Sequence, residues 1–196
     1  MSDNTTLDTS EIMRVVDDHS RDALRYYWTA SDYWHYGWHG RPERISAVAE
    51  LVAEHYLGDI VEIGCADGIT TVKLAEVAKR HGRKIIAIDP WERDPQDYET
   101  FIERMIAYGD VLDILRMKSQ QASVIRYLKA HKLCFAFIDG EHSPIALKSD
   151  IGAVYHAPVI ACDEMIWDGL LLRAFHEAAK DRRKIRHPYC NEAYIV

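Results

Sequence analysis

Short apolar runs alternate with longer amphipathic stretches along most of the chain. The runs are rich in Val and Ile, as is typical of strands that are buried on both faces of a parallel sheet. They occupy residues 59–64, 84–89, 113–117, 133–139, 158–163 and 192–196. Between them apolar residues recur at helical spacing, and Ile45, Val48, Val52 and Tyr56 form one such stripe. This alternation predicts an α/β fold, in which helices cover both faces of a mostly parallel, doubly wound sheet.

The chain of 196 residues is long enough for one domain with a sizeable core. We expect this domain to span residues 41–196 and to follow an N-terminal helical extension at residues 1–40. The segment RYYWTASDYWHYGWHG, residues 25–40, is dense in aromatic side chains and has neither helical nor strand periodicity. These side chains either pack beneath the N-terminal arm or form a lid over a bound cofactor and substrate. The extension is also a candidate contact surface for a homo-oligomer.

Composition and charge narrow the class of partner. Hydrophobic residues make up 48% of the chain, yet no apolar run approaches the roughly 18 residues of a membrane span. The first residues, MSDNTTLDTSE, lack the basic start and the apolar stretch of a secretory signal, so we expect a cytoplasmic protein with no membrane partner. A net charge of −7 disfavours nucleic acid as a partner, because phosphate contacts need clustered Lys and Arg. The basic segment at residues 180–187 is either a solvated helix end or a contact for an anionic substrate.

Acidic residues end three of the predicted strands, namely Asp89, Asp139 and Asp163. The carboxyl ends of parallel strands meet at one edge of a sheet, and in open α/β sheets ligands bind at that edge. We therefore expect the three side chains to gather at one crevice. Neighbouring carboxylates repel one another unless a cation or hydrogen-bond donors compensate, so this spacing indicates a bound ligand.

The stretch VEIGCADGITT, residues 61–71, combines a strand end, a glycine-bearing turn and a helix start. Gly64 and Gly68 allow the backbone to approach a ligand closely, and the following helix offers free N–H groups. The G-x-G-x-x-G fingerprint of dinucleotide binding is absent, and the turn lacks a phosphate-binding Lys. Such a turn suits a ligand without a pyrophosphate, for example S-adenosylmethionine. Asp89 at the end of the next strand can accept hydrogen bonds from both ribose hydroxyls; the alternative is that Asp89, before Pro90, only initiates a turn.

These two segments resemble the first motifs of class I S-adenosylmethionine-dependent methyltransferases. The family's E-x-G-x-x-x-G motif falls on Glu62, Gly64 and Gly68, with Cys65 inside it, and the family's ribose-binding acid falls on Asp89. The resemblance implies a Rossmann-like sheet of seven strands and assigns these five residues to the cofactor site.

A second resemblance concerns the segment KSQQASVIRYL. In catechol O-methyltransferase a Ser-Gln pair borders the adenine, and Ser119 and Gln120 occupy those places here. By their own chemistry, a hydroxyl and an amide just after a strand could equally cap the next helix.

The end of the crevice near Asp139 is rich in possible metal ligands. Asp139, Asp163 and the adjacent Glu164 would supply hard oxygen ligands to an octahedral cation, which fits Mg²⁺ or Mn²⁺. His142 follows Asp139 closely enough to reach a substrate on the same ion without being a ligand. The alternative is that the carboxylates only cap helices.

The segments IDGEH and ACDEMIWDG are similar to metal-dependent O-methyltransferases, and most closely to those acting on macrolide sugars and to their cephalosporin-biosynthesis relatives. This resemblance implies that Asp139, Asp163 and Glu164 hold the metal, that Asp139 also borders the cofactor, and that His142 is the general base. Glu164 stands where catechol O-methyltransferase has Asn, and His142 where that enzyme has a catalytic Lys.

The function implied is a Mg²⁺-dependent O-methyltransferase. It would move a methyl group from S-adenosylmethionine to a hydroxyl of a small metabolite, such as a sugar, a polyol or another natural-product intermediate. The alternatives are a nicotinamide-dependent oxidoreductase on the same sheet and a non-catalytic, S-adenosylmethionine-binding partner subunit.

Overall fold

The computed structural model describes residues 7–26, 41–165, 169–187 and 190–196. Most of the aromatic segment, residues 27–40, lies outside these described residues. Its two interpretations, packing beneath the N-terminal arm and a lid over the ligands, stay predictions. Strands and helices alternate along the described chain. In order they are α1 (Thr9–Tyr26), α2 (Arg41–His55), β1 (Asp59–Ile63), α3 (Ile69–Arg80), β2 (Ile85–Ile88), α4 (Pro95–Met105), the 3₁₀ turn η2 (Ile106–Tyr108), β3 (Leu112–Leu115), α5 (Ala122–Ala130), β4 (Leu133–Ile138), α6 (Pro144–Val154), β5 (Val159–Cys162), α7 (Gly169–Ala179), β6 (Lys184–Arg186) and β7 (Ala193–Ile195).

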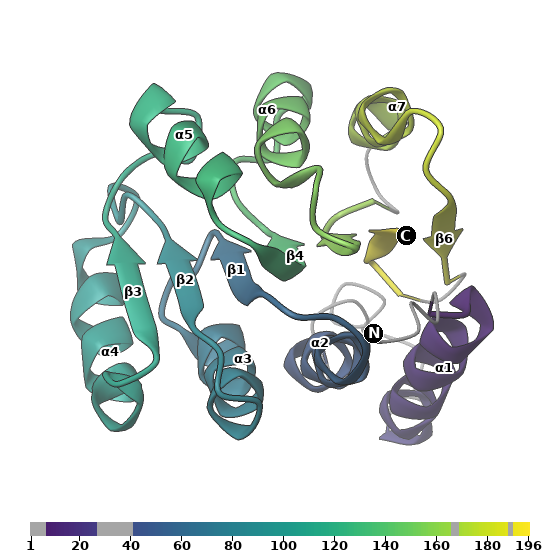
Figure 1. The fold of residues 1–196 in the computed structure, drawn as a ribbon, viewed down its shortest axis with the longest axis horizontal. Helices are drawn as coiled ribbons and strands as arrows, with labels where there is room; N and C mark the ends of the chain where they lie inside the picture. Colours follow the sequence, from purple (N-terminus) through teal and green to yellow (C-terminus); the bar gives the residue numbers. More distant parts are fainter. Residues whose placement is uncertain (1–6, 27–40, 166–168, 188–189) are drawn as a thin grey trace.

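The strands form one seven-stranded sheet in the order β3-β2-β1-β4-β5-β7-β6 (Figure 1). The strands from β3 to β5 pair in parallel, and β7 runs antiparallel to both of its neighbours. The predicted fold class, a doubly wound and mostly parallel sheet, is therefore confirmed. The order reverses between β1 and β4, and in sheets of this kind the crevice at such a reversal is where ligands bind.

Each of the predicted apolar runs contains or overlaps a strand, with β3 beginning one residue before its predicted run, and the strand that the sequence analysis missed is β6 at the sheet edge. β6 lies inside the basic segment that was interpreted as a helix end or an anion contact; the helix-end interpretation was wrong for Lys184–Arg186. Only Ile185 of this strand is buried. Charged residues on an exposed edge strand hinder pairing with another sheet. Just before it, Arg182 donates hydrogen bonds to the carbonyl oxygens of Tyr155 (2.7 Å) and Ala157 (2.8 Å), so this cation is used inside the fold.

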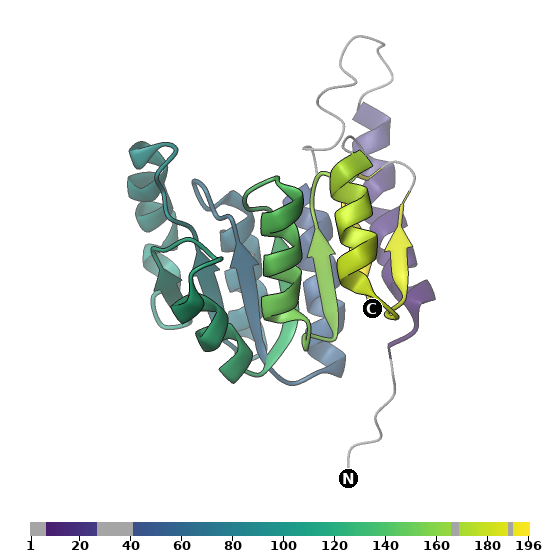
Figure 2. The ribbon, with the colours of Figure 1, turned by 90° about the horizontal axis from the view of Figure 1, so that it is seen from above.

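Helices cover both faces of the sheet, with α1 to α4 on one face and α5 to α7 on the other (Figure 1). Successive residues of a strand point to opposite faces. Ile60 accordingly packs in the core beneath α2 and α3, whereas Val61 and Ile63 pack in the core beneath α5 and α6. Figure 2 shows α6 and α7 side by side in front of the strands. Burial on both faces explains why the strands are continuous apolar runs.

The N-terminal helix α1 is attached to the body of the domain. Ile12 is fully buried in the core shared with α2. Ser20 Oγ lies 3.0 Å from Cys190 Sγ, and His187 Nε2 lies 2.7 Å from Asp17 Oδ1. The described part of the extension is thus joined to the C-terminal segment that leads into β7.

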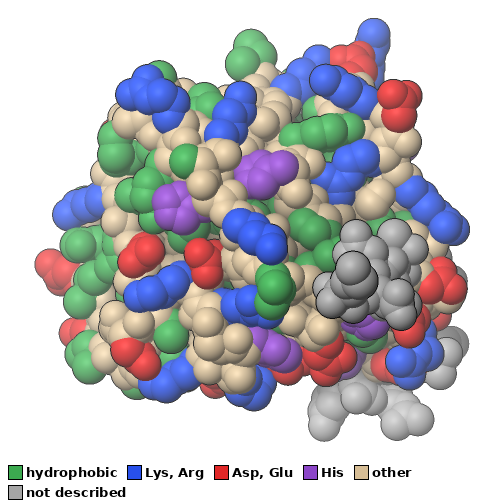
Figure 3. Space-filling view, viewed as in Figure 1, with side chains coloured by type: hydrophobic (Ala, Val, Ile, Leu, Met, Phe, Trp, Pro, Cys, Tyr) green, Lys and Arg blue, Asp and Glu red, His purple; other side chains and the backbone are tan. Residues whose placement is uncertain are grey.

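The surface carries charges of both signs. On the face shown in Figure 3, Lys and Arg side chains are interspersed with Asp and Glu rather than gathered by sign. Among the described residues, no helix has the length and apolar character needed to cross a membrane.

Candidate active site

The turn between β1 and α3 brings the backbone close to the end of β4. Gly64 has a φ of 87°, and a Cβ atom placed on it would lie 2.1 Å from the carbonyl oxygen of Asp139. Gly68, at the start of α3, also has a φ of 87°, and its Cβ would lie 2.9 Å from Phe101 Cδ2. Gly64 is therefore required both by its left-handed backbone conformation and by the direct contact between two strand ends.

Asp89 holds this turn in place. Its Oδ2 atom accepts hydrogen bonds from the backbone N–H groups of Cys65 (2.9 Å) and Ala66 (3.1 Å), and its Oδ1 atom accepts one from Trp91 (2.6 Å). The Trp91 indole N–H donates back to the carbonyl oxygen of Ala66 at 2.7 Å. A carboxylate has about four acceptor positions, so Asp89 keeps acceptor capacity for a ligand hydroxyl. Trp91, which the sequence analysis gave no role, clamps the other side of the turn.

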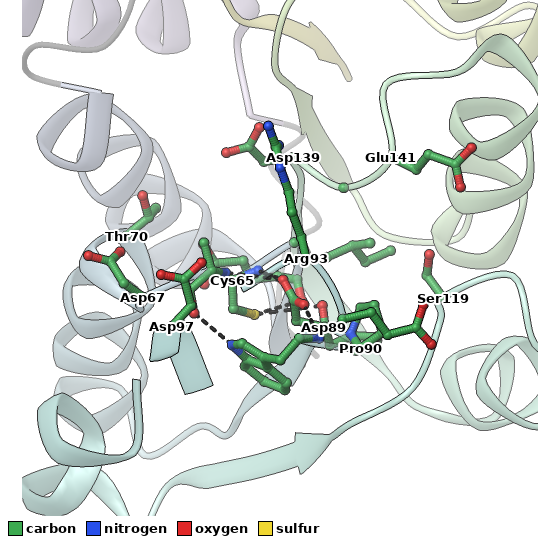
Figure 4. A pocket seen from close by; sticks show the side chains of 18 of the residues that line it. Cys65, Asp67, Thr70, Asp89, Pro90, Arg93, Asp97, Ser119, Asp139 and Glu141 are labelled. Atoms are coloured by element: carbon green, nitrogen blue, oxygen red, sulfur yellow. Dashed lines mark hydrogen bonds between the residues drawn. The ribbon is translucent and has the colours of Figure 1, made fainter. Parts of the chain in front are cut away.

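A cavity of ≈ 660 Å³ opens beside the turn (Figure 4). Its volume is in the range of small-molecule sites. The walls bring together most of the residues that the sequence analysis assigned to the cofactor, and His142 as well. These wall residues are Glu62, Gly64, Cys65, Asp89, Ser119, Gln120, Asp139 and His142; Gly68, at the start of α3, is not among the described wall residues. The structure thus assembles the predicted positions around one space, and their individual roles stay predictions.

Ser119 and Gln120 meet a buried acid that the sequence analysis missed. Gln120 Nε2 donates to Ser119 Oγ at 2.7 Å and to the carboxylate of Asp150, on α6, at 3.0 and 3.2 Å. Asp150 is 1% exposed, and burial raises its pKa to about 6, against the opposing effect of its hydrogen bonds with Ser119 and Gln120. Because the amide nitrogen faces these oxygens, the amide oxygen of Gln120 is the atom left for a ligand. The pair does not act as a helix cap: the cap residue of α5 is Gln121.

Glu62 and Cys65 carry little charge at neutral pH. Burial raises the pKa of Glu62 to about 8; a hydrogen bond with Thr71 opposes this shift, and repulsion from Asp139 adds to it. Glu62 Oε2 is buried with no hydrogen-bond partner among the described residues. Burial also raises the pKa of the Cys65 thiol well above its usual value, which makes this thiol an unreactive part of the wall. A protonated Glu62 can donate a hydrogen bond to a ligand.

At the other end of the cavity, the carboxylates of Asp139 and Asp163 converge on Arg41, the first residue of α2. Arg41 Nη1 lies 2.9 Å from Asp139 Oδ2 and 2.5 Å from Asp163 Oδ2. Asp163 is 3% exposed, and its Oδ1 atom has no hydrogen-bond partner in the described part of the chain. Asp89, Asp139 and Asp163 were expected to gather at one crevice. Asp89 and Asp139 do line the same cavity, and Asp163 meets Asp139 at Arg41 but is not among the described wall residues.

His142 lies between two carboxylates. Its Nε2 atom is 3.3 Å from Asp139 Oδ1, and its Nδ1 atom is 3.0 Å from Glu164 Oε2. The hydrogen bond with Asp139 raises the pKa of His142, against the effect of burial, and the charge of Glu164 adds to the rise. Burial raises the pKa of Asp139 to about 6; the His142 hydrogen bond opposes this, and repulsion from Asp163 adds to it. The contact of His142 with Asp139 is the longer one, so an entering hydroxyl can most easily replace it.

The residues at this end do not fit a divalent ion as they stand. Among the described residues, no group of three or more His, Cys, Asp or Glu side chains has the arrangement of a metal site. The point shared by Asp139 and Asp163 is occupied by the Arg41 guanidinium, and Glu164 contacts His142 instead. Arg41 and Asp139 line the cavity, but Asp163 and Glu164 are not among its described wall residues. The donor chemistry is right for Mg²⁺, and the arrangement is that of ion pairs.

Solved structures of several O-methyltransferases have the same fold. The apo structure of CalS11, a TDP-rhamnose 3′-O-methyltransferase of calicheamicin biosynthesis, superimposes with a TM-score of 0.64 at 14% identity, covering 96% of this chain and 95% of that one. The O-methyltransferase TomG from Streptomyces achromogenes, involved in tomaymycin synthesis and solved with S-adenosylmethionine, gives 0.58 at 15% identity, with coverage of 97% and 90%. An O-methyltransferase from Bacillus cereus in complex with S-adenosylhomocysteine gives 0.55 at 14% identity, with coverage of 93% and 89%. At these identities the likeness concerns the fold.

A sheet of this order, with a glycine turn and an acidic second strand end beside one cavity, is the architecture of a class I methyltransferase. The family model described as a methyltransferase domain matches residues 61–161, which is more than half of the chain, and the protein belongs to this family. The resemblance inferred from the motifs is thereby confirmed. No curated protein matches this sequence significantly.

Proposed function

We propose that the protein transfers the methyl group of S-adenosylmethionine to a hydroxyl oxygen of a small molecule. The observation that carries the proposal is the single cavity that joins the glycine turn, Asp89 and Gln120 at one end to Asp139 and His142 at the other. The first group is suited to hold a nucleoside. The second group is suited to receive the proton of an acceptor hydroxyl that lies next to the methyl group of the bound cofactor.

The reaction is a direct displacement. The acceptor oxygen attacks the methyl carbon, the carbon–sulfur bond breaks, and its electron pair remains on sulfur as S-adenosylhomocysteine is formed. The hydroxyl proton passes to His142, which the Glu164 carboxylate at 3.0 Å orients. Burial of the reactants in the cavity, with the acceptor held near the sulfonium, supplies the proximity on which such a displacement depends.

At the cofactor end of the cavity, two residues would bind different parts of the nucleoside. Asp89 would accept hydrogen bonds from the ribose, and the amide oxygen of Gln120 would accept one from the exocyclic amine of adenine. The orphaned Oε2 of buried Glu62 supports the presence of a polar ligand group at the centre of the wall. We extend the proposal to a sugar, polyol or related acceptor, because the CalS11 methyltransferase with the same fold is described as acting on TDP-rhamnose.

The proposal is tested by calorimetry followed by a turnover assay. S-adenosylmethionine and S-adenosylhomocysteine should bind, and NAD should not. A panel of acceptors that includes TDP-rhamnose, free polyols and a catechol should then contain one that is methylated, with S-adenosylhomocysteine formed in equal amount. Binding of NAD in place of S-adenosylmethionine would favour an oxidoreductase. Tight cofactor binding with no methylated product from any hydroxyl acceptor would favour a non-catalytic binding subunit.

Replacement of Asp150 by Asn should weaken cofactor binding without abolishing it. The variant loses the charge that fixes the Gln120 amide, and a hydrogen bond to a charged group contributes about 1.5–3 kcal/mol, so calorimetry should show a Kd for S-adenosylhomocysteine raised about tenfold or more. Because the amide can then turn over, the preference for S-adenosylhomocysteine over its inosine analogue should fall as well. Asp181→Asn, at an exposed aspartate remote from the cavity walls, is the matched control. Unchanged affinity and unchanged base preference in Asp150→Asn would show that Gln120 does not read the adenine.

A further inference from the structure

Arg41 is placed where three separate elements meet. It begins α2, while Asp139 follows β4 and Asp163 follows β5. Its Nη1 atom contacts both carboxylates, and the side chains of Arg41, Asp139 and Asp163 are 12%, 15% and 1% exposed. These ion pairs are therefore largely removed from solvent, where charged contacts are less screened than at a surface.

The position of Arg41 is fixed by its surroundings. Its guanidinium carbon lies 5.9 Å from the centroid of the Phe137 ring, within the range of a cation–π contact. One turn further along α2, Arg44 Nη2 contacts Glu192 Oε1 at 2.8 Å, and both of these side chains are buried. The same helix buries Ile45 in the core. The first turn of α2 therefore cannot swing away without breaking a second buried ion pair.

Basic side chains of the chain contact all three carboxylates that were expected to hold Mg²⁺, and the two that share one point, Asp139 and Asp163, have the permanent cation Arg41 between them. The contacts form one row, from Asp163 through Arg41 and Asp139 to His142 and Glu164. Acidic and basic side chains alternate along it. A bound metal was expected because gathered carboxylates repel one another. Protein side chains offset this repulsion here.

A tethered guanidinium also competes well with a free ion. Its local concentration is set by the fold, whereas Mg²⁺ must lose tightly held water and then find near-octahedral geometry. We infer that Arg41 takes the place of the divalent cation at this edge of the sheet, so that the protein has a resident guanidinium between Asp139 and Asp163 instead of a Mg²⁺ or Mn²⁺ site. Arg41 lines the cavity, and on the proposed function its charge would lie beside the acceptor oxygen as that oxygen loses its proton.

The inference is tested with Mn²⁺ alone, in the absence of cofactor and acceptor. Binding is followed by calorimetry and by the electron paramagnetic resonance signal of free Mn²⁺. The wild-type protein should show no specific site. Arg41→Ala should create one that binds at least about tenfold more tightly than any wild-type binding, because the removed charge no longer repels the ion. Adding Asp163→Asn to Arg41→Ala should remove the site again.

Lys118→Ala is the matched control. Lys118 lines the same cavity, but its acidic partner is the single carboxylate of Glu92 at 2.8 Å, so loss of Lys118 should create no Mn²⁺ site. Stoichiometric Mn²⁺ binding by the wild type that disappears in Asp163→Asn would overturn the inference. So would a folded Arg41→Ala variant with no affinity for Mn²⁺. If Arg41→Ala does not fold, Arg41→Gln replaces it. The wild-type measurement alone still shows whether the protein has a resident metal site.

The result is independent of the proposed function. Failure to bind S-adenosylmethionine would contradict the methyltransferase proposal and would not affect the Mn²⁺ comparison. A specific Mn²⁺ site in the wild-type protein would contradict the inference about Arg41 and would not affect the proposal of methyl transfer.

Discussion

Gly64→Ala should lose folding stability and cofactor affinity together. Ala at a φ of 87° costs about 1–2 kcal/mol, because the Cβ atom crowds the following carbonyl. The same Cβ would lie 2.1 Å from the Asp139 carbonyl oxygen and 2.5 Å from its carbonyl carbon, so β1 and β4 must also separate at their carboxyl ends. Overpacking of this kind typically costs about 1–3 kcal/mol more. Urea unfolding measures the stability, and calorimetry measures the affinity for S-adenosylhomocysteine.

Gly82→Ala provides a control at which the backbone is also left-handed but a Cβ atom is not crowded. Gly82 has a φ of 62°, and a Cβ atom placed there would have no neighbour within 4 Å. This variant should lose about 1–2 kcal/mol and bind the cofactor normally. If both variants lost the same stability and kept the same affinity, the close approach of the Gly64 turn to Asp139 would be contradicted.

The parts of the site that sequence reasoning predicted are those with a local signal. The glycine turn and the acid at the end of the next strand lie in two consecutive strand-turn segments. Alternating apolar runs give the sheet, and the carboxyl ends of parallel strands give the edge at which acidic residues collect. These two regularities were sufficient to predict that Asp139 and Asp163 meet at one point, although 24 positions separate them (163 − 139).

The parts that it missed depend on contacts between distant segments. Arg41 and Asp163 are 122 positions apart, and an Arg that opens an amphipathic helix has no feature that distinguishes it from a solvated one. Asp150 is a single acid in a helix, 30 positions from Gln120. The only available hint was that Asp150 falls among the apolar positions of its helix, which are otherwise buried. Whether a cation from the chain or from solution balances gathered carboxylates cannot be read from the spacing of the carboxylates.

Glu164 shows a second limit of motif reasoning. Adjacent acids at a strand end were expected to hold the same ion, but neighbouring side chains of an extended chain point in different directions. Glu164 has a φ of 59°, in the left-handed region, and its carboxylate reaches His142, whereas that of Asp163 reaches Arg41. The two adjacent acids therefore contact two different basic side chains.

His142→Ala should reduce the maximal rate of methyl transfer far more than it changes cofactor binding. On the proposed function, His142 receives the acceptor's proton, and loss of a general base typically costs about 10²–10⁴-fold in rate. The cofactor end of the cavity is built from other residues, so the Kd for S-adenosylhomocysteine should stay within about twofold of wild type, well below the tenfold that corresponds to 1.4 kcal/mol. The measurement is single-turnover methyl transfer to the acceptor found in the panel, alongside calorimetry.

Two further variants separate proton transfer from positioning. His142→Gln keeps a hydrogen-bonding side chain but cannot take up a proton, so a general base predicts that its rate falls as far as that of His142→Ala, whereas a positioning role predicts partial recovery. His176→Ala, at an exposed histidine on α7, should leave the rate unchanged. Full turnover in His142→Ala would remove this side chain from the mechanism. The proton would then have to leave by another route, and Asp139, whose pKa burial raises to about 6 and whose carboxylate lies at the same end of the cavity, would be the next group to replace.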